Sequence, residues 1–156
     1  MNIQVLRSEL VDDPLGLNYQ SMSDAQAADS LNTPNRPGKQ AVAASDVRMY
    51  VLLNGLWPAI QNVAANSTDP VHKGTAITIL QTLGAGSFDA IRMNIPEIAA
   101  GVAAMLQTMV AAGAITAENR AAMIAMGDAL VSRADELGLG GPVHHLTVAE
   151  ARNGVA

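Results

Sequence analysis

Signals that start and stop helices recur along this chain, whereas signals for strands are almost absent. "SDAQ" at 23–26 and "TVAE" at 147–150 have the pattern of a capping box, in which the first and fourth residues satisfy backbone groups of a helix's first turn. Asp69 followed by Pro70 is a second kind of helix start, and Gly84 lies where that helix would end. We therefore predict an all-α fold, a single compact domain of about seven or eight short helices.

Apolar spacing and the start and stop signals together place these helices along the chain. Residues 32–39, rich in proline and polar side chains, are predicted to form a loop, and Ser45 or Asp46 should cap the helix that follows. Within the single domain, residues 1–38 would supply the N-terminal helices and a loop, and residues 45–156 the helical core. The predicted helices cover residues 3–11, 24–31, 46–53, 58–65, 70–83, 96–112 and 117–126, followed by a short capped stretch after Ser132 and a last turn or two over 147–152.

The most apolar run, residues 95–115, is predicted to contain one long apolar helix near residues 96–112. The run is long enough to span a bilayer, but much of it is alanine and glycine, and Glu97 and Gln107 lie within it. We therefore expect a buried or interfacial helix rather than a membrane-inserted one. Its opposite face is mostly alanine, so a second helix or subunit could approach closely there. The large side chains of its apolar stripe belong to Ile98, Val102, Met105, Leu106 and Met109.

Composition narrows the class of protein. Hydrophobic residues make up 49% of the chain but aromatic residues only 3%, so aliphatic and methionine side chains must fill the core. Cysteine is absent, which excludes disulfides and thiolate metal sites. The net charge is -5 and the only lysines are Lys39 and Lys73, a balance that disfavours phosphate neutralisation on nucleic acid and docking on an anionic membrane. We expect neither nucleic acid nor a membrane as a partner.

None of the residue patterns predicts a catalytic, cofactor or metal site. His144 and His145 are adjacent, so their side chains point about 100° apart on a helix, which favours a polar turn over a shared metal. "GAGS" at 84–87 has no preceding strand and no third glycine, which favours a turn in the connection "GAGSFDAI". The acidic pairs at 12–13 and 135–136 are interpreted as residues of helix termini rather than as an acid–base pair. We expect no enzyme activity, no cofactor, no metal ion and no small-molecule substrate.

A segment with a glycine-containing turn, "MLQTMVAAGAITAENRAAMIA", has the outline of a helix-turn-helix. Its second helix would present one cation, Arg120, beside one acid, Glu118. Recognition helices bring more positive charge to the major groove. The pattern therefore favours an antiparallel helix hairpin over a DNA-reading motif.

Tyr19 follows "DDPLGLN" in a chain that has few aromatic residues. Asp13-Pro14 should end the first helix and Gly16 should permit a reversal of the chain. The Tyr19 ring would then be buried in a packed corner that docks the first helix against the second. A tyrosine also suits a site that is apolar at one end and wet at the other, including a subunit boundary.

The spacing "DPLG..Y..MSDAQAADSLN...R" over residues 13–36, with "GAITAENRAAM" and "SRADELGLG...TVAEAR" near the other end, resembles a family of small, uncharacterised tailed-bacteriophage proteins. Its members are encoded among virion structural genes. The resemblance implies a virion protein made in the cytoplasm of a bacterial host, whose partners are other virion proteins and copies of itself. It carries no catalytic residues.

We therefore expect a non-enzymatic virion structural protein, a multi-copy subunit of the neck, tail or capsid that serves as an adaptor, tail component or cement protein. Two alternatives stay open: a helical protein-interaction or regulatory phage protein, and an ejected, membrane-active virion protein. The predicted interface residues are Tyr19, Trp57, Ile98, Ala103, Met105 and Met109.

Overall fold

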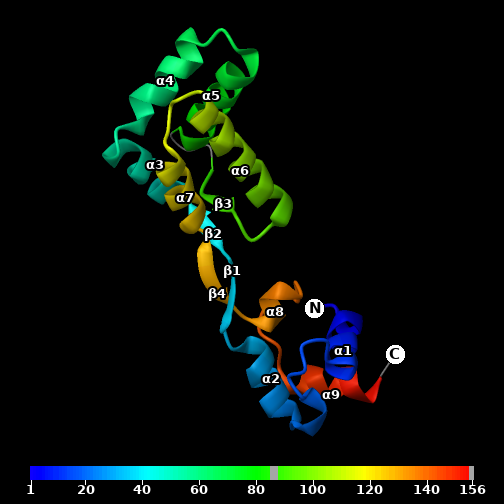
Figure 1. Ribbon diagram of the computed structural model, residues 1–156. Helices are drawn as coiled ribbons and strands as arrows, with labels where there is room; N and C mark the ends of the chain where they lie inside the picture. The colour runs from blue at the N-terminus through cyan, green and yellow to red at the C-terminus, as the bar shows by residue number, and fades with distance from the viewer. Residues whose placement is uncertain (85–87, 155–156) are drawn as a thin grey trace. The chain divides into compact units, whose positions relative to one another are not determined.

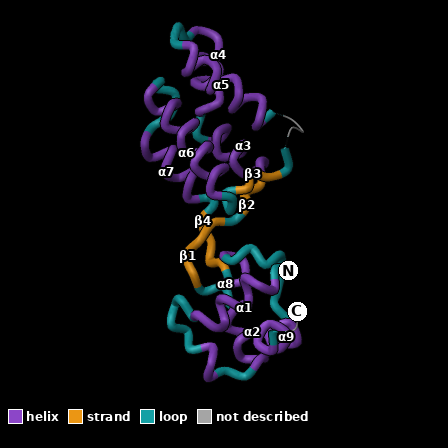
Figure 2. The backbone as a smooth tube through the Cα atoms, turned by 90° about the vertical axis from the view of Figure 1, so that its right-hand side faces the viewer, coloured by secondary structure: helices purple, strands orange, loops and turns teal. Residues whose placement is uncertain are grey.

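The computed structural model describes residues 1–84 and 88–154, and α-helices dominate that part of the chain (Figure 2). The chain divides into two compact units. Unit 1 comprises residues 1–38 and 130–156, and unit 2 comprises residues 39–129. The mostly helical fold is confirmed, but the predicted helical core over residues 45–156 does not form one body. Its last part, from residue 130 onward, packs with residues 1–38 instead.

Unit 1 brings together helices from both ends of the sequence. The first helix packs against the last, and α2 contacts both the last helix and α8 (Figure 1). Leu6 and Tyr19 are fully buried between these elements, together with Val148. The elements are α1 (Ile3–Asp12), the 3-10 turn η1 (Tyr19–Ser21), α2 (Asp24–Asn32), α8 (Arg133–Glu136) and α9 (His145–Asn153).

Unit 2 is a group of helices beside a two-stranded sheet. In that sheet β2 and β3 pair antiparallel, with Val42 opposite Ile91. Along the chain, α4 packs on α5, α5 on α6, and α6 on α7. The elements are β2 (Ala41–Ala43), α3 (Ala44–Leu53), α4 (Leu56–Asn66), α5 (Pro70–Leu83), β3 (Ala90–Arg92), α6 (Pro96–Ala111) and α7 (Ala117–Ala125). As the composition predicts, buried side chains in the unit 2 core are aliphatic or methionine.

The chain passes between the two units within β1 (Arg36–Lys39) and within β4 (Asp128–Val131). These two strands pair with each other. Residues 32–39 were predicted to form a loop, so this strand pair corrects the prediction. The strands are only three or four residues long, and each pairs with a segment far away in the sequence. Local propensity gives little signal for strands of that kind.

Several helix starts are confirmed by the caps that the sequence indicates. Ser23 and Gln26 form the predicted capping box at α2. The Asp69 side chain caps α5, with Pro70 as its first residue. Ser132 forms a capping box at α8, and Thr116 forms another at α7. These signals were readable because a cap and its helix lie within four residues of each other.

Two predicted starts are wrong. α3 begins at Ala44, directly after β2, so its N-cap is Ala43 rather than Ser45 or Asp46. α9 begins at His145, and the His144 ring accepts a hydrogen bond from the backbone N–H of Leu146. Thr147 therefore lies inside the helix and does not cap it. In both cases a neighbouring element fixes the chain before the favoured capping residue is reached.

The predicted long apolar helix is a third correction. α6 has 16 residues, but only Leu106 and Met109 are buried along it. Ile98 is 38% exposed, and several alanine and glycine residues of the helix are exposed as well, so α6 does not act as a long apolar helix. In the described ranges, no helix has both the length and the apolar character needed to cross a membrane. Residues 85–87 of the "GAGS" turn lie outside the described residues.

Candidate functional site: the exposed face of α3 and the ion pairs of unit 1

α3 has one buried face and one exposed face, and both are apolar. Val47 and Val51 point into the unit 2 core. On the other side, Met49 is 56% exposed, Leu52 50% and Leu53 79%. The spacing of these three residues, i, i+3 and i+4, places them on one side of the helix. We call Met49, Leu52 and Leu53 the α3 face.

A shallow groove of about 170 Å³ lies beside the α3 face. Leu52 and the half-buried Trp57 line it, together with Leu83 at the end of α5. The guanidinium of Arg48 also lines it and donates to the carbonyl oxygens of Leu83 at 2.5 Å and Gly84 at 2.7 Å. Because those carbonyls are at the C-terminal end of α5, the positive charge of Arg48 is already opposed within the protein.

Tyr50 fixes α3 from another side. Its hydroxyl accepts a hydrogen bond from the amide of Asn119 on α7, at 3.2 Å. The helix is therefore held by its buried valines, by Arg48 and by Tyr50, while the α3 face stays exposed. An exposed apolar group on a well-anchored helix is typical of a protein contact surface.

Unit 1 contains a chain of charged side chains that joins three elements. Arg133 on α8 donates to both carboxylate oxygens of Glu9 on α1, at 2.9 and 2.7 Å. Glu9 is only 3% exposed. Arg133 also contacts Glu136 at 2.9 Å, and Arg36 on β1 contacts the same Glu136 oxygen at 2.8 Å. A bidentate pair with this burial fixes the geometry of α1 and α8.

These contacts shift the pKa values of the charged groups. The hydrogen bonds to Glu9 raise the pKa of Arg133 further above its usual range, against the opposing effect of burial. Burial works to raise the pKa of Glu136, but hydrogen bonds from Arg133 and then Arg36 outweigh it, so that the pKa is lowered. Glu136 therefore carries its negative charge to a lower pH than usual.

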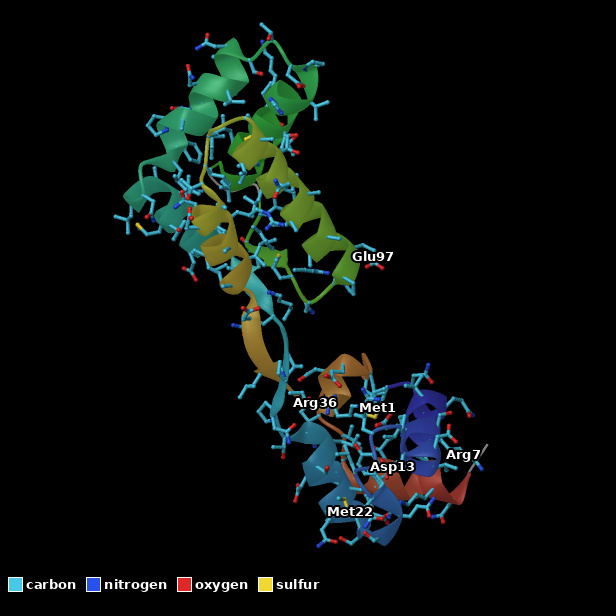
Figure 3. The ribbon with its side chains drawn as sticks, viewed as in Figure 1. Met1, Arg7, Asp13, Met22, Arg36 and Glu97 are labelled. Carbon is cyan, nitrogen blue, oxygen red and sulfur yellow. The ribbon has the colours of Figure 1, made fainter. Side chains whose placement is uncertain are left out.

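Tyr19 lies in the core of unit 1, as predicted. Its ring is fully buried, and Gly16 has a φ of +64°, the left-handed conformation expected at the reversal. Asp13, labelled in Figure 3, holds the corner by accepting from the backbone N–H groups of Leu17 and Asn18, at 2.8 and 2.6 Å. Asp13 is the C-cap of α1, so the prediction that Asp13-Pro14 ends the first helix is confirmed.

The hydroxyl of Tyr19 has no hydrogen-bond partner within the described residues. Burial and, next, the negative charge of Glu9 raise the pKa of Tyr19 to about 12. The backbone carbonyl of Tyr19 does have a partner, because it accepts from Arg152 of α9 at 2.6 Å. Arg152 also donates to the Met22 carbonyl and to Asp24, which joins α9 to the start of α2.

The predicted interface residues fall in different places. Tyr19 and Met109 are fully buried within the chain, so neither presents a surface to a partner. Trp57 is half-buried in the groove beside the α3 face. On α6, Ile98 is 38% exposed, and Ala103 and Met105 are half-buried.

Sequence reasoning did not identify the α3 face or the Glu9–Arg133 pair. The predicted helix over residues 46–53 contains Leu53 as well as Val47 and Val51, and its run of apolar residues does not say which side is buried. Glu9 and Arg133 are 124 residues apart, and no local pattern connects them.

In the part of the chain that the structure describes, there is no group of three or more histidine or acidic side chains that could hold a metal ion. No family model, no curated protein and no solved structure matches this chain.

Proposed function

We propose that this chain is a non-enzymatic structural subunit of a tailed-bacteriophage virion, assembled in many copies in the neck, tail or capsid. The motifs at both ends of the sequence, which resemble small virion-module proteins, support the placement in a virion. The single structural observation that supports assembly is the α3 face, with its three large exposed apolar side chains on a firmly held helix.

Burying these side chains would favour association. Moving an exposed leucine or methionine fully out of water contributes about 1.5–3 kcal/mol. Leu53 is 79% exposed, so most of this gain is still available to a contact. No charged side chain belongs to the α3 face itself. The nearby Arg48 is paired with carbonyl oxygens at the end of α5. An apolar group that docks on the face would therefore leave no buried charge without a partner.

The occupant that fits best is a second copy of this chain. A protruding leucine, Leu53, lies directly after Leu52, which lines the groove with Trp57. The groove, about 170 Å³, is of a size to take one leucine side chain. When a projection and a recess lie next to each other on one surface, a two-fold axis can place each copy's projection in the other copy's recess. Trp is also enriched at the energetic centres of interfaces.

The test compares two exposed leucines. Leu53→Glu places a charge on the α3 face, and Leu146→Glu places the same charge on α9, where Leu146 is 65% exposed. Sedimentation velocity of the wild-type protein should give a dimer or a larger assembly. Leu53→Glu should sediment as a monomer with unchanged circular dichroism and melting temperature, whereas Leu146→Glu should assemble like the wild type.

Two results would overturn the proposed contact: a wild-type protein that is monomeric at every concentration, or Leu53→Glu assembling as the wild type does. A wild-type monomer would favour the alternative of a regulatory protein that binds a different partner.

A further inference from the structure

Unit 2 contains an apolar cavity of about 60 Å³ within its core. Residues of β2 and β3 and of all five helices α3 to α7 line it, so it is surrounded by every element of the unit. Fourteen residues form its lining: Val42, Val47, Val51, Ile60, Ile79, Thr82, Leu83, Ile91, Met93, Val102, Leu106, Met109, Ile115 and Met123.

The chemistry of this lining decides what the cavity can hold. Among the described residues that line it, Thr82 is the only one whose side chain carries a hydroxyl, and none carries a charge. A space of this size corresponds to about four waters, and each buried water needs two to four polar partners. One hydroxyl cannot satisfy such a cluster. Water inside the cavity would therefore be poorly bound, and a nonpolar occupant would displace it at little cost.

Three methionines give the lining a second property. Met93, Met109 and Met123 are unbranched and polarizable, so they adapt to the shape of an occupant and make favourable dispersion contacts with it. Their flexibility also lets the cavity widen slightly for a group larger than its resting volume. The valines and isoleucines around them have stiff side chains and keep the cavity from collapsing.

We propose that this cavity is a binding site for a small nonpolar molecule or alkyl group that carries no charge and no hydrogen-bond donor. This site goes beyond the proposed assembly function and does not depend on it. Most of its lining residues are buried in unit 2, among them Val47 and Val51 of α3, whereas the α3 face is exposed on the other side of that helix.

Xenon is a suitable probe, because dry apolar cavities take it up. Protein with 13C-labelled methyl groups would be studied by NMR under increasing xenon pressure. The methyl signals of Val51, Ile79 and Met109 should shift in a saturable manner. These shifts should be at least about five-fold larger than those of Val148, a fully buried methyl-bearing residue in the core of unit 1.

Two variants test whether xenon binds in this cavity rather than throughout the protein. Val51→Ile adds a methylene to the lining and should remove most of the saturable response. Thr82→Val replaces the Thr82 hydroxyl with a methyl of similar size and should leave the response equal or stronger, which keeps the test decisive if Val51→Ile does not fold. The proposal is wrong if wild-type shifts match those of Val148, if a folded Val51→Ile variant responds fully, or if Thr82→Val abolishes binding.

Discussion

At the scale of single residues, burial of the Tyr19 ring is favourable, whereas burial of its hydroxyl is not. The ring fills the core of unit 1, but its hydroxyl is buried without a hydrogen-bond partner in the described part of the chain. Apolar burial and polar desolvation are separate contributions, and an unpaired buried hydroxyl costs about 1–3 kcal/mol. The ring should therefore stabilise unit 1 even though its polar end does not.

Two substitutions at Tyr19 should have opposite effects. Tyr19→Ala should lower the free energy of unfolding by about 3–5 kcal/mol, because it leaves a cavity in the core. Tyr19→Phe keeps the ring and removes the unpaired hydroxyl, so its stability should equal or exceed that of the wild type. Urea unfolding of the three proteins measures both changes. If Tyr19→Phe were less stable by more than about 1 kcal/mol, the hydroxyl would have a partner after all.

Glu136 makes the stability of unit 1 depend on pH. Its pKa in the folded protein lies below the usual value of 4.5, so it stabilises the fold fully above that value. This stabilisation is lost as the pH falls through the lowered pKa. Glu136→Gln should be less stable than the wild type at pH 7, by about 1 kcal/mol or less for partly exposed ion pairs.

The difference between the wild type and Glu136→Gln should narrow as the pH is lowered from about 5 to 2. Thermal unfolding at a series of pH values follows it. Glu150→Gln, which removes an exposed carboxylate from α9 of the same unit, should leave the pH dependence of the wild type unchanged. A constant difference between wild type and Glu136→Gln over the whole range would mean that the ion pairs do not hold the carboxylate.

At the scale of elements, a glycine sets how closely two strands approach. A Cβ added at Gly38 on β1 would clash with the side chain of Val131 on β4, whose Cγ1 would be 2.9 Å away. Gly38→Ala should therefore cost about 1–3 kcal/mol of stability. In a Val131→Ala background the same change should cost much less, because the clashing methyl carbons are gone. A double-mutant cycle by chemical denaturation measures the coupling, and additive effects would show that the strands separate at no cost.

The helices were predictable and the strands were not, for a physical reason. Asp69 and Pro70 predict the start of α5, because a cap acts on backbone groups only a few residues away. β2 could not be seen in the same way, since Val42 becomes a strand residue through its pairing with Ile91, 49 positions along the chain. Three-residue strands have too little alternation to show a pattern.

The candidate interaction surface was also out of reach of sequence patterns. Trp57, one of the predicted interface residues, lines the groove. Leu53, however, lies on a helix with two apolar faces, and the packing of α4, α5, β2 and β3 against α3 decides which face is covered. The apolar content of α6 drew attention instead, although its small residues contribute little buried area.

At the scale of the whole molecule, each of the two units has a core of its own. Unit 1 joins sequence segments on either side of unit 2 and fixes them with the Glu9–Arg133 pair. Unit 2 is held by aliphatic and methionine contacts and carries the α3 face. This division gives the proposed subunit one unit whose geometry is set by charge pairs and another that offers an apolar contact to a second copy.

The central claim, that the chain is a multi-copy virion subunit, is tested most directly by its copy number in purified phage particles. Quantitative mass spectrometry against labelled peptide standards gives copies per particle relative to the known virion proteins. The account predicts a fixed number that matches a symmetric ring or lattice, reduced by Leu53→Glu and kept by Leu146→Glu. If the protein is present in infected cells but missing from purified particles, the claim is contradicted.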